Sequence, residues 1–521
     1  MIAQIRSFTC PFLLLLLCWG GTFSAHARQR NKDKEKPAPP AQTYRAEIES
    51  NSFDDDHTVR ALPDSSLLVV STKNSSWFGK ADFVVSKYDR QLQLVWQEKY
   101  EHKPSHDLLH IAADRNLIYL LFSTASSKKL VLYQLRLATG KGSFSEHELP
   151  SSYINIREMA ALDGQVFLSG LDRQNLNMLH LNPSEEAIKL LPAVFGMEED
   201  LGEFRVDTLT RAVEFVVEES NGWRSRVQTK RMNTKGEVIG TYFIQPEMDY
   251  RNDNTLQAGR LTPGDTLTKR LIGTYGHRTS IFAKGLFTSD LAGNLQYYDF
   301  SKLSHFFEYL SPRAERRMKA KFARQEAKGK PLVLRYRMLL HPVIPHPLGY
   351  AVVGEVYYPQ YRDNNLYQYS PLAGRYPELR DIRSRVDGFR FTHAIVCVFD
   401  KEGKLVWDNS YKLKNRTYPL LAPTIEAGVN PQGHITLVYP DEEYIWYKTV
   451  RPNASLSDEE KVEVRVREES EKMLTNQTDG IIHFYGSNFV AFGFQRIRPA
   501  QGESRTVFYL QNMAFEPTAT P

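Results

Sequence analysis

The feature that most constrains the fold is the regular return of two turn patterns along the chain. In the first, an Asp or Asn stands three residues before a Gly, as in Asp400-Lys401-Glu402-Gly403. A type I turn favours Asp at its first position and Gly at its fourth, so each copy predicts a tight hairpin. The turn at Asp400 separates the β-branched run Thr392–Phe399 from Leu405-Val406-Trp407, and both flanks are typical of strands.

This first pattern recurs from end to end. Tyr88-Asp89 to Trp96 aligns without a gap with Phe399-Asp400 to Trp407, sharing the Asp and a Leu-Val-Trp triplet. The further copies are Asn233–Gly236 and Asp290–Gly293, with weaker ones near Thr139-Gly140, Asn182-Pro183 and Arg451–Asn453.

The second pattern is a turn that precedes a strongly apolar strand. Its members are Asp64, Asp114, Asp163-Gly164 and Asn430–Gly433, and, less clearly, segments near Asp207, Gly264, Gly349 and Ser487. Interleaved, the two patterns give about eight units, most of them spaced near the roughly 40 to 50 residues of a four-stranded blade. We therefore predict an all-β fold, a single seven- or eight-bladed β-propeller over residues 43–516. An array of β-sandwiches is the alternative, but the recurring Asp and Trp positions favour the propeller.

The N-terminus predicts export. Arg6, the apolar run 11–19 and Ala25-His26-Ala27 follow the order of a secretory signal peptide, which we place at 1–27. Residues 28–42 are charged and proline-rich and predict a disordered linker, and 517–521 form a short tail.

Cys397 is the one cysteine outside the signal, so we expect no internal disulfide, and its apolar strand suggests a buried thiol.

Two insertions interrupt the regular spacing of the turn patterns between Asp290 and Asp400. Residues 301–331 predict a basic helix, because Ser311 is a suitable N-cap, Pro312 suits the first turn and Gly329 follows the last. Its basic surface comprises Arg313, Arg316, Arg317, Lys319, Lys321 and Arg324. This helix is a candidate for peripheral contact with an anionic membrane surface, or else a solvated helix held by Met318 and Phe322.

The second insertion, 357–387, is a proline-containing loop rich in tyrosine. Its tyrosines are Tyr357, Tyr358, Tyr361, Tyr367, Tyr369 and Tyr376, and Arg390 follows it. Tyrosines offer large, stiff contact surfaces with a polar tip, so we expect a ligand or partner to dock on this loop. The alternative is that the tyrosines pin the loop to its own propeller.

From about 300 to 413 the order of features resembles an uncharacterised family of exported β-propeller-like proteins from Gram-negative bacteria. The resemblance rests on the basic helix and then on the segments LRYRMLLHPVI, GYAVVGEVYYPQY and GFRFTHAIVCVFDKEGKLVWDNSY. It implies location in the cell envelope, either periplasmic or extracellular and outer-membrane associated. It supplies no catalytic residue.

Charge and motifs narrow the function classes. The net charge of +5 is spread over 521 residues, which argues against nucleic acid as a partner. The sequence contains no GxSxG, HExxH, Walker or GxGxxG motif, and we expect neither a cofactor nor a metal. His106 and His110 share a predicted strand, where roughly 13 Å would separate them, too far for one ion.

Three polar residues near the Thr392 strand are the weak catalytic candidates: Glu355, Asp387 and His393. A carboxylate–imidazole pair can perform acid–base chemistry if it faces a common pocket. The alternative is that these groups satisfy one another and the backbone. We therefore expect an exported, non-enzymatic binding or scaffold protein of the bacterial envelope, with an unknown protein or glycan partner. The alternative is a propeller-type hydrolase acting on glycans or peptides.

Overall fold

In a computed structural model the chain divides after Pro39, and the propeller belongs to the unit Pro40–Pro521. The structure describes residues 39–50, 56–72, 81–102, 106–124, 126, 128–172, 175–191, 201–220, 225–247, 253–277, 281–329, 334–361, 386–414, 416–441, 443–452, 460–468 and 470–515.

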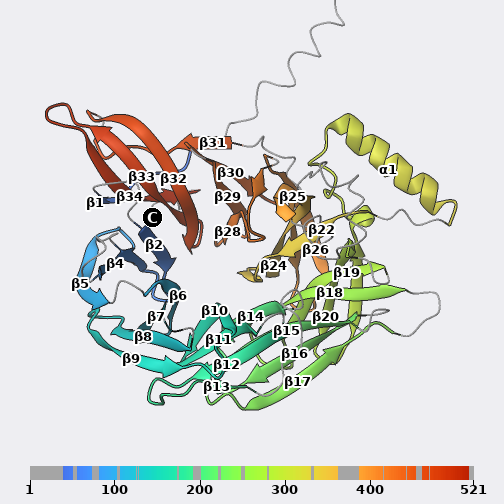
Figure 1. The fold of residues 1–521 in the computed structure, drawn as a ribbon. Coiled ribbons are helices and arrows are strands. Elements are labelled where there is room, and N and C mark those ends of the chain that lie inside the picture. Colours follow the sequence, from blue (N-terminus) through green and yellow to red (C-terminus); the bar gives the residue numbers. More distant parts are fainter. Residues whose placement is uncertain are drawn as a thin grey trace, which may run out of the picture. The chain divides into compact units, whose positions relative to one another are not determined.

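The described strands form eight antiparallel sheets that follow one another around a ring, from blue to red in Figure 1. Blade 1 contains β2 (Asp56–Ala61), β3 (Leu67–Thr72), β4 (Ala81–Tyr88) and β5 (Leu94–His102). Blade 2 contains β6 (Leu108–Ala113), β7 (Leu117–Ser123), β8 (Lys129–Arg136) and β9 (Gly142–Glu148). Blade 3 contains β10 (Ile154–Leu162), β11 (Gln165–Asp172), β12 (Asn175–Leu181) and β13 (Lys189–Leu190). Blade 4 contains β14 (Leu201–Asp207), β15 (Ala212–Ser220), β16 (Ser225–Met232) and β17 (Val238–Ile244).

The second half continues the series. Blade 5 contains β18 (Asn254–Leu261), β19 (Arg270–His277), β20 (Ala283–Asp290) and β21 (Leu295–Asp299). Blade 6 contains β22 (Arg337–Leu340), β23 (Ile344–His346), β24 (Gly349–Tyr361), β25 (Val386–Phe399), β26 (Leu405–Lys412) and β27 (Thr417–Tyr418). Blade 7 contains β28 (Glu426–Val429), β29 (Ile435–Asp441), β30 (Tyr444–Val450) and β31 (Glu460–Glu463). Blade 8 contains β32 (Lys472–Tyr485), β33 (Asn488–Arg498), β34 (Arg505–Ala514) and β1 (Arg45–Glu49). Two helices lie between blades 5 and 6, η2 (Phe300–Lys302) and α1 (Pro312–Glu326).

The predicted propeller is confirmed. The sequence allows seven or eight blades, and the structure has eight. The second turn pattern marks the hairpin between the first two strands of a blade in seven blades, and in blade 6 it lies between β23 and β24. The first pattern marks the hairpin between the last two strands in blades 1 to 5 and the hairpin between β25 and β26 in blade 6, and in blade 7 Arg451 follows β30.

Apolar side chains are buried between successive blades. Along β3, Leu68 and Val70 pack toward blade 2, whereas Leu67 and Val69 pack toward blade 8. Since successive side chains of a strand point to opposite faces, a strand with a blade on each side must be apolar at consecutive positions. This double burial explains the uninterrupted apolar runs that follow the second turn pattern.

The ring is closed by the N-terminal strand. β1 pairs with β34, with Ala46 opposite Leu510, and supplies the outer strand of blade 8. The pairing extends to Ala41, whose backbone bonds that of Ala514. The propeller therefore begins before residue 43, within the stretch that composition assigned to the linker, because Ala41 and Gln42 have bonding partners on blades 7 and 8.

The recurrent aspartates of the second pattern join neighbouring blades. Asp114 accepts a hydrogen bond from the amide of Leu117 in its own turn (2.8 Å) and one from Gly164 of blade 3 (2.9 Å). Asp207 accepts one from Leu209 in its own turn (3.0 Å) and one from Gly264 of blade 5 (3.2 Å). A carboxylate with two oxygens can satisfy both turns at once, which a hydroxyl or an apolar side chain cannot.

Both insertions emerge at the same end of blade 6. The strands alternate in direction, so the connection from blade 5 to β22, which carries α1, shares that end with the end of β24 and the start of β25. The tyrosine-rich insertion is shorter than the sequence suggested. Tyr357 to Tyr361 are not loop but the end of β24, since they pair with Phe391, Arg390 and Phe389 and continue to Val386 on β25.

Candidate functional site

The three weak catalytic candidates lie apart. Glu355 is buried on β24, where it accepts hydrogen bonds from His341 Nε2 (2.6 Å), the Thr424 amide (2.8 Å) and the Ile425 amide (3.1 Å), and also contacts the Thr424 hydroxyl. These partners hold the carboxylate between blades 6 and 7. Its oxygens are therefore already bonded to the protein.

His393 faces the opposite side of the same sheet. It pairs with Val356, the residue after Glu355, so the two side chains point to different faces. Its ring stacks on Tyr309 with 3.5 Å between centroids, and burial lowers its pKa to about 3. Asp387 is exposed at the start of β25. The structure thus brings no two of the three candidates together. The His393 imidazole, neutral and stacked in the core, packs as a core residue does.

The described tyrosines of the insertion pack against the blade. Tyr357 contacts the rings of Phe389 and Phe391, with centroids 5.8 and 6.0 Å apart. Tyr358 lies against Tyr336, and burial raises its pKa to about 12. The side chain of Tyr361, and all of Tyr367, Tyr369 and Tyr376, lie outside the described part of the structure. Arg390 pairs with Tyr358 across the strands, and its Nε has no hydrogen-bond partner among the described residues.

The helix α1 has the predicted capping, with the Ser311 side chain accepting from the Ala314 amide and Pro312 in the first turn. The half-buried Met318 and Phe322 pack against the cluster between blades 5 and 6, with the Phe322 and Phe307 rings 5.5 Å apart. All six predicted basic residues are exposed. Lys319 pairs with Glu315 at 2.7 Å. The other five basic residues make no ion pair with a described carboxylate: Arg313, Arg316, Arg317, Lys321 and Arg324.

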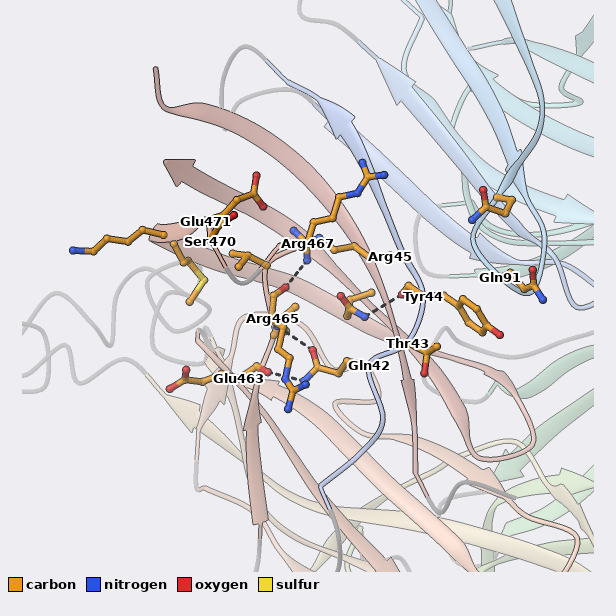
Figure 2. Close-up of a pocket in the computed structure, with 16 residues that line it drawn as sticks. Gln42, Thr43, Tyr44, Arg45, Gln91, Glu463, Arg465, Arg467, Ser470 and Glu471 are labelled. Atoms are coloured by element: carbon orange, nitrogen blue, oxygen red, sulfur yellow. Dashed lines mark hydrogen bonds between the residues drawn. The ribbon is translucent and has the colours of Figure 1, made fainter. Parts of the chain in front are cut away.

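A polar cleft of about 1000 Å³ lies beside the closing strand β1 (Figure 2). Its lining comes from four separate parts of the chain: Gln42–Arg45, the turn residues Gln91 and Gln93, the segments 463–467 and 470–473, and Gln511. No local sequence pattern predicts this cleft, because the segments that form it are up to hundreds of residues apart.

The walls of the cleft are held by defined hydrogen bonds. Gln42 donates to the Glu463 carbonyl (2.8 Å) and accepts from the Arg465 amide (3.0 Å), two of the contacts drawn in Figure 2. Arg45 donates to the Arg465 carbonyl (2.7 Å) and to Gln495 (2.7 Å). The segment between blades 7 and 8 is therefore fixed to the N-terminal strand.

Two carboxylates at these walls, Glu47 and Glu471, are neutralised by arginines, whereas the exposed lining residue Glu463 makes no ion pair with a described cation. Glu47 pairs with Arg45 (2.8 Å) and with Arg505 (2.7 Å), which also binds Glu471 (2.7 Å). Burial by itself raises the pKa of Glu47, but the two arginines outweigh it and hold that pKa below its usual value. Three exposed cations of the lining, Arg465, Arg467 and Lys472, make no ion pair with a described carboxylate. Among the described residues, the unpaired cations of the lining therefore outnumber its one unpaired carboxylate, Glu463, and leave an excess of positive charge for a ligand.

A second group of charges lies on the innermost strands. Glu158 on β10 is exposed, yet desolvation raises its pKa, while Arg260 on β18 opposes the shift. Glu203 on β14 and Glu426 on β28 also have raised pKa values because of burial. The residue Glu158 is thus exposed, yet enough protein surrounds its carboxyl to disfavour the charged form.

Imidazoles on β6 and β32 complete this group. Burial lowers the pKa of His110 and of His483, whose backbone amide donates to Glu426. Perturbed groups of this kind often mark functional sites, although structural ion pairs produce them too. Glu158 and Glu203 both follow a β-bulge in their strands, a local signal that the sequence pattern did not reveal.

In the described part of the chain, no three His, Cys, Asp or Glu side chains are arranged to hold a metal ion. Within the same residues, no helix has both the length and the apolar character needed to cross a bilayer. Cys397 is a buried free thiol within the apolar cluster between blades 5 and 6, opposite Asp408 on β26, and burial and then the charge of Asp408 raise the pKa of the thiol. It is a packing residue of the core.

No protein-family model matches the sequence. No curated protein matches it either. Solved structures with a similar arrangement include the polysaccharide lyase Uly1, at 9% identity over 91% of this chain and 100% of the other, with a TM-score of 0.37. Prolyl oligopeptidase B from Galerina marginata matches at 8% identity over 88% of this chain and 56% of its own, with a TM-score of 0.37.

The β-propeller domain of the Trilobed protease from Pyrococcus furiosus matches at 8% identity over 78% of this chain and 93% of that domain, with a TM-score of 0.33. A Synechocystis apocarotenoid oxygenase matches at 8% identity and a TM-score of 0.30, and the match spans 60% of its length. Similarity this low carries no argument about activity.

Proposed function

We propose that this protein is an exported, non-enzymatic binding protein of the bacterial envelope, and that an acidic carbohydrate binds in the cleft beside β1. The observation that carries the proposal is the cleft itself, a space of about 1000 Å³ with fixed walls and three exposed cations on its lining that make no ion pair with a described carboxylate. Fixed walls reduce the ordering cost of binding.

The chemistry of the lining supports a hydroxyl-rich anion. Four side-chain amides, Gln42, Gln91, Gln93 and Gln511, can donate to and accept from sugar hydroxyls. Thr43 and Ser470 add hydroxyls, and Tyr44 adds an aromatic ring. Arg465, Arg467 and Lys472 can bind carboxylates through charge-assisted hydrogen bonds. A neutral sugar would leave those cations unused, whereas an acidic one engages them.

Export is supported by the order of Arg6, the apolar run 11–19 and Ala25-His26-Ala27. The resemblance of 300–413 to exported proteins of Gram-negative bacteria points the same way. The intact mass of the mature protein, recovered from a periplasmic or secreted fraction, tests this step, and a mass that begins after Ala27 is expected.

Binding is tested by titration calorimetry of the mature protein with short oligogalacturonates. Neutral cello-oligosaccharides of equal length serve as the comparison ligands. The variant Arg465→Ala/Arg467→Ala/Lys472→Ala should lose roughly tenfold or more in affinity, since it removes several charge-assisted hydrogen bonds. The matched variant Arg115→Ala/Arg136→Ala/Lys141→Ala removes three exposed cations of blade 2 and should bind as the native protein does.

Equal affinity for acidic and neutral sugars, or equal losses in the two triple variants, would overturn the cleft as the site. Chromatography of the titrated sugar tests the non-enzymatic part. Shortened or unsaturated products that vanish in Glu158→Gln would show a hydrolase or lyase, because Glu158 is a solvent-facing carboxyl with a raised pKa.

A further inference from the structure

We propose that the end of blade 6 that carries α1 docks peripherally on a bilayer containing anionic phospholipids. Two independent features lie at this end, a stripe of arginines on α1 and a pair of exposed leucines in the next connection along the chain. The carbohydrate cleft has no part in this surface, so the two proposals stand separately.

The arginine stripe follows from helical spacing. Arg313, Arg317 and Arg324 are four and seven residues apart, which places them on one face of the helix. Met318 and Phe322 hold the opposite face against Phe307. Because the apolar side is already used within the protein, the stripe is directed away from the body. Figure 1 shows α1 at the periphery of the propeller.

The charges of the stripe are available to a partner. All three arginines are exposed, and none makes an ion pair with a described carboxylate. Their Cα atoms span about 16 Å along the helix at 1.5 Å per residue. A guanidinium binds phosphate oxygens in a forked geometry, so a row of this length can contact several lipid phosphates at once.

The second feature is apolar. Leu420 is 73% exposed and Leu421 is 40% exposed, although both are large hydrophobic residues. They follow Tyr418 of β27, which pairs with Phe389 near the start of β25, and they precede β28. Strand direction therefore places them at the same end of blade 6 as α1. Adjacent exposed leucines beside a basic helix have the chemistry of a shallow membrane anchor.

The occupant is a lipid surface rather than free phosphate, because phosphate alone would leave the leucines in water. Neither feature suffices alone: the leucines are too few for stable insertion, and the stripe is screened by salt. Together they predict binding that requires anionic lipid, weakens with salt and retains an apolar component.

Vesicle flotation tests the proposal with the mature protein. It should float with vesicles of phosphatidylcholine and phosphatidylglycerol and stay unbound with phosphatidylcholine alone. Raising the salt from about 50 to about 500 mM should release most of it. The variant Arg313→Glu/Arg317→Glu/Arg324→Glu should lower the partition coefficient roughly tenfold or more, since each cation near such a surface contributes.

Controls separate the alternatives. Arg115→Glu/Arg136→Glu/Lys141→Glu makes the same charge change on blade 2 and should bind within about twofold of the native protein. Leu420→Ser/Leu421→Ser should weaken binding severalfold at every salt concentration. Absence of native binding at low salt, an equal loss in the blade 2 variant, or displacement by about 10 mM inorganic phosphate would overturn the proposal. Circular dichroism confirms that each variant is folded.

Discussion

Lys269 should be indispensable to the stability of blades 4 and 5. Its ammonium is fully buried and lies 2.7 Å from Asp207 Oδ2, 2.8 Å from Glu214 Oε1 and 3.0 Å from the Thr262 carbonyl. Glu214 also pairs with Arg231 at 2.9 Å. Replacing Lys269 by Met keeps an unbranched side chain that is one heavy atom shorter and removes the charge, which leaves Asp207 buried without its cation.

The expected cost follows from the burial of the group. Removing one partner of a buried ion pair destabilises a protein by about 3–5 kcal/mol, because the remaining charge loses its compensation. For a unit of this size the entropy of unfolding is roughly 1 kcal/mol per kelvin, so the melting temperature should fall by roughly 3–5 °C. Arg231 continues to neutralise Glu214, so the lower end of the range is the better expectation.

The deficit should depend on pH. Burial by itself raises the pKa of Asp207, but the hydrogen bond and charge of Lys269 outweigh it and hold the pKa below its usual value. This stabilisation is therefore present above the unfolded pKa of Asp and is lost as the pH falls through the folded one. In Lys269→Met the pKa of Asp207 rises, so native and variant proteins should differ less at pH 4 than at pH 7.

Urea unfolding followed by tryptophan fluorescence at both pH values measures these differences. Lys141→Met, an exposed lysine, should match the native protein, and Lys269→Met/Asp207→Asn should recover part of the loss by removing the uncompensated carboxylate. A single variant Lys269→Met that unfolds at the native urea concentration at pH 7 would refute the reasoning. A deficit that grows toward pH 4 would refute the assignment to Asp207.

Two further predictions concern blade 6. Burial lowers the pKa of His393 to about 3, so between pH 7 and pH 5 the native imidazole is protonated only on unfolding. The free energy of unfolding of His393→Phe, relative to that of the native protein, should therefore rise by roughly 2 kcal/mol as the pH falls from 7 to 5. Urea titrations that show no such pH-dependent rise would contradict this prediction. Replacing 362–385 by a short Gly/Ser linker, with Tyr357 and Tyr358 kept, should leave the thermal melt nearly unchanged and abolish pull-down of an envelope protein or glycan that docks on the tyrosine-rich loop. A large loss of stability with that pull-down intact would assign Tyr367, Tyr369 and Tyr376 to packing.

Much of the fold could be predicted because each blade repeats the same local turn residues and apolar strands. Asp114 and Asp163 recur because a turn and an inter-blade contact both need a carboxylate. Apolar runs such as Leu67–Val70 recur because each strand is buried on both faces. The sequence alone does not decide between seven and eight blades, because the turns near Asp207 and Gly264 match the turn pattern only weakly. Strand pairing determines the number directly.

The site could not be predicted in the same way. The cleft brings Gln42 and Arg45 against residues 463–473, a contact between the two ends of the propeller that only ring closure creates. Glu158, Glu203 and Glu426 stand in three different blades, so no spacing in the sequence relates them. Glu355 and His393 looked like a pair because they are near one another on paired strands. Alternation along the strands places them on opposite faces.

Hydrogen–deuterium exchange with and without an oligogalacturonate tests the central claim most directly. The claim is that the cleft beside β1 is the ligand site. Exchange should slow at Gln42–Arg45, across 463–467 and 470–473, and at the other lining residues Gln91, Gln93 and Gln511. It should be unchanged elsewhere, and the protection should disappear in Arg465→Ala/Arg467→Ala/Lys472→Ala. Protection confined to the inner strands β10, β14 and β28, or no protection at a saturating concentration of the sugar, would contradict it.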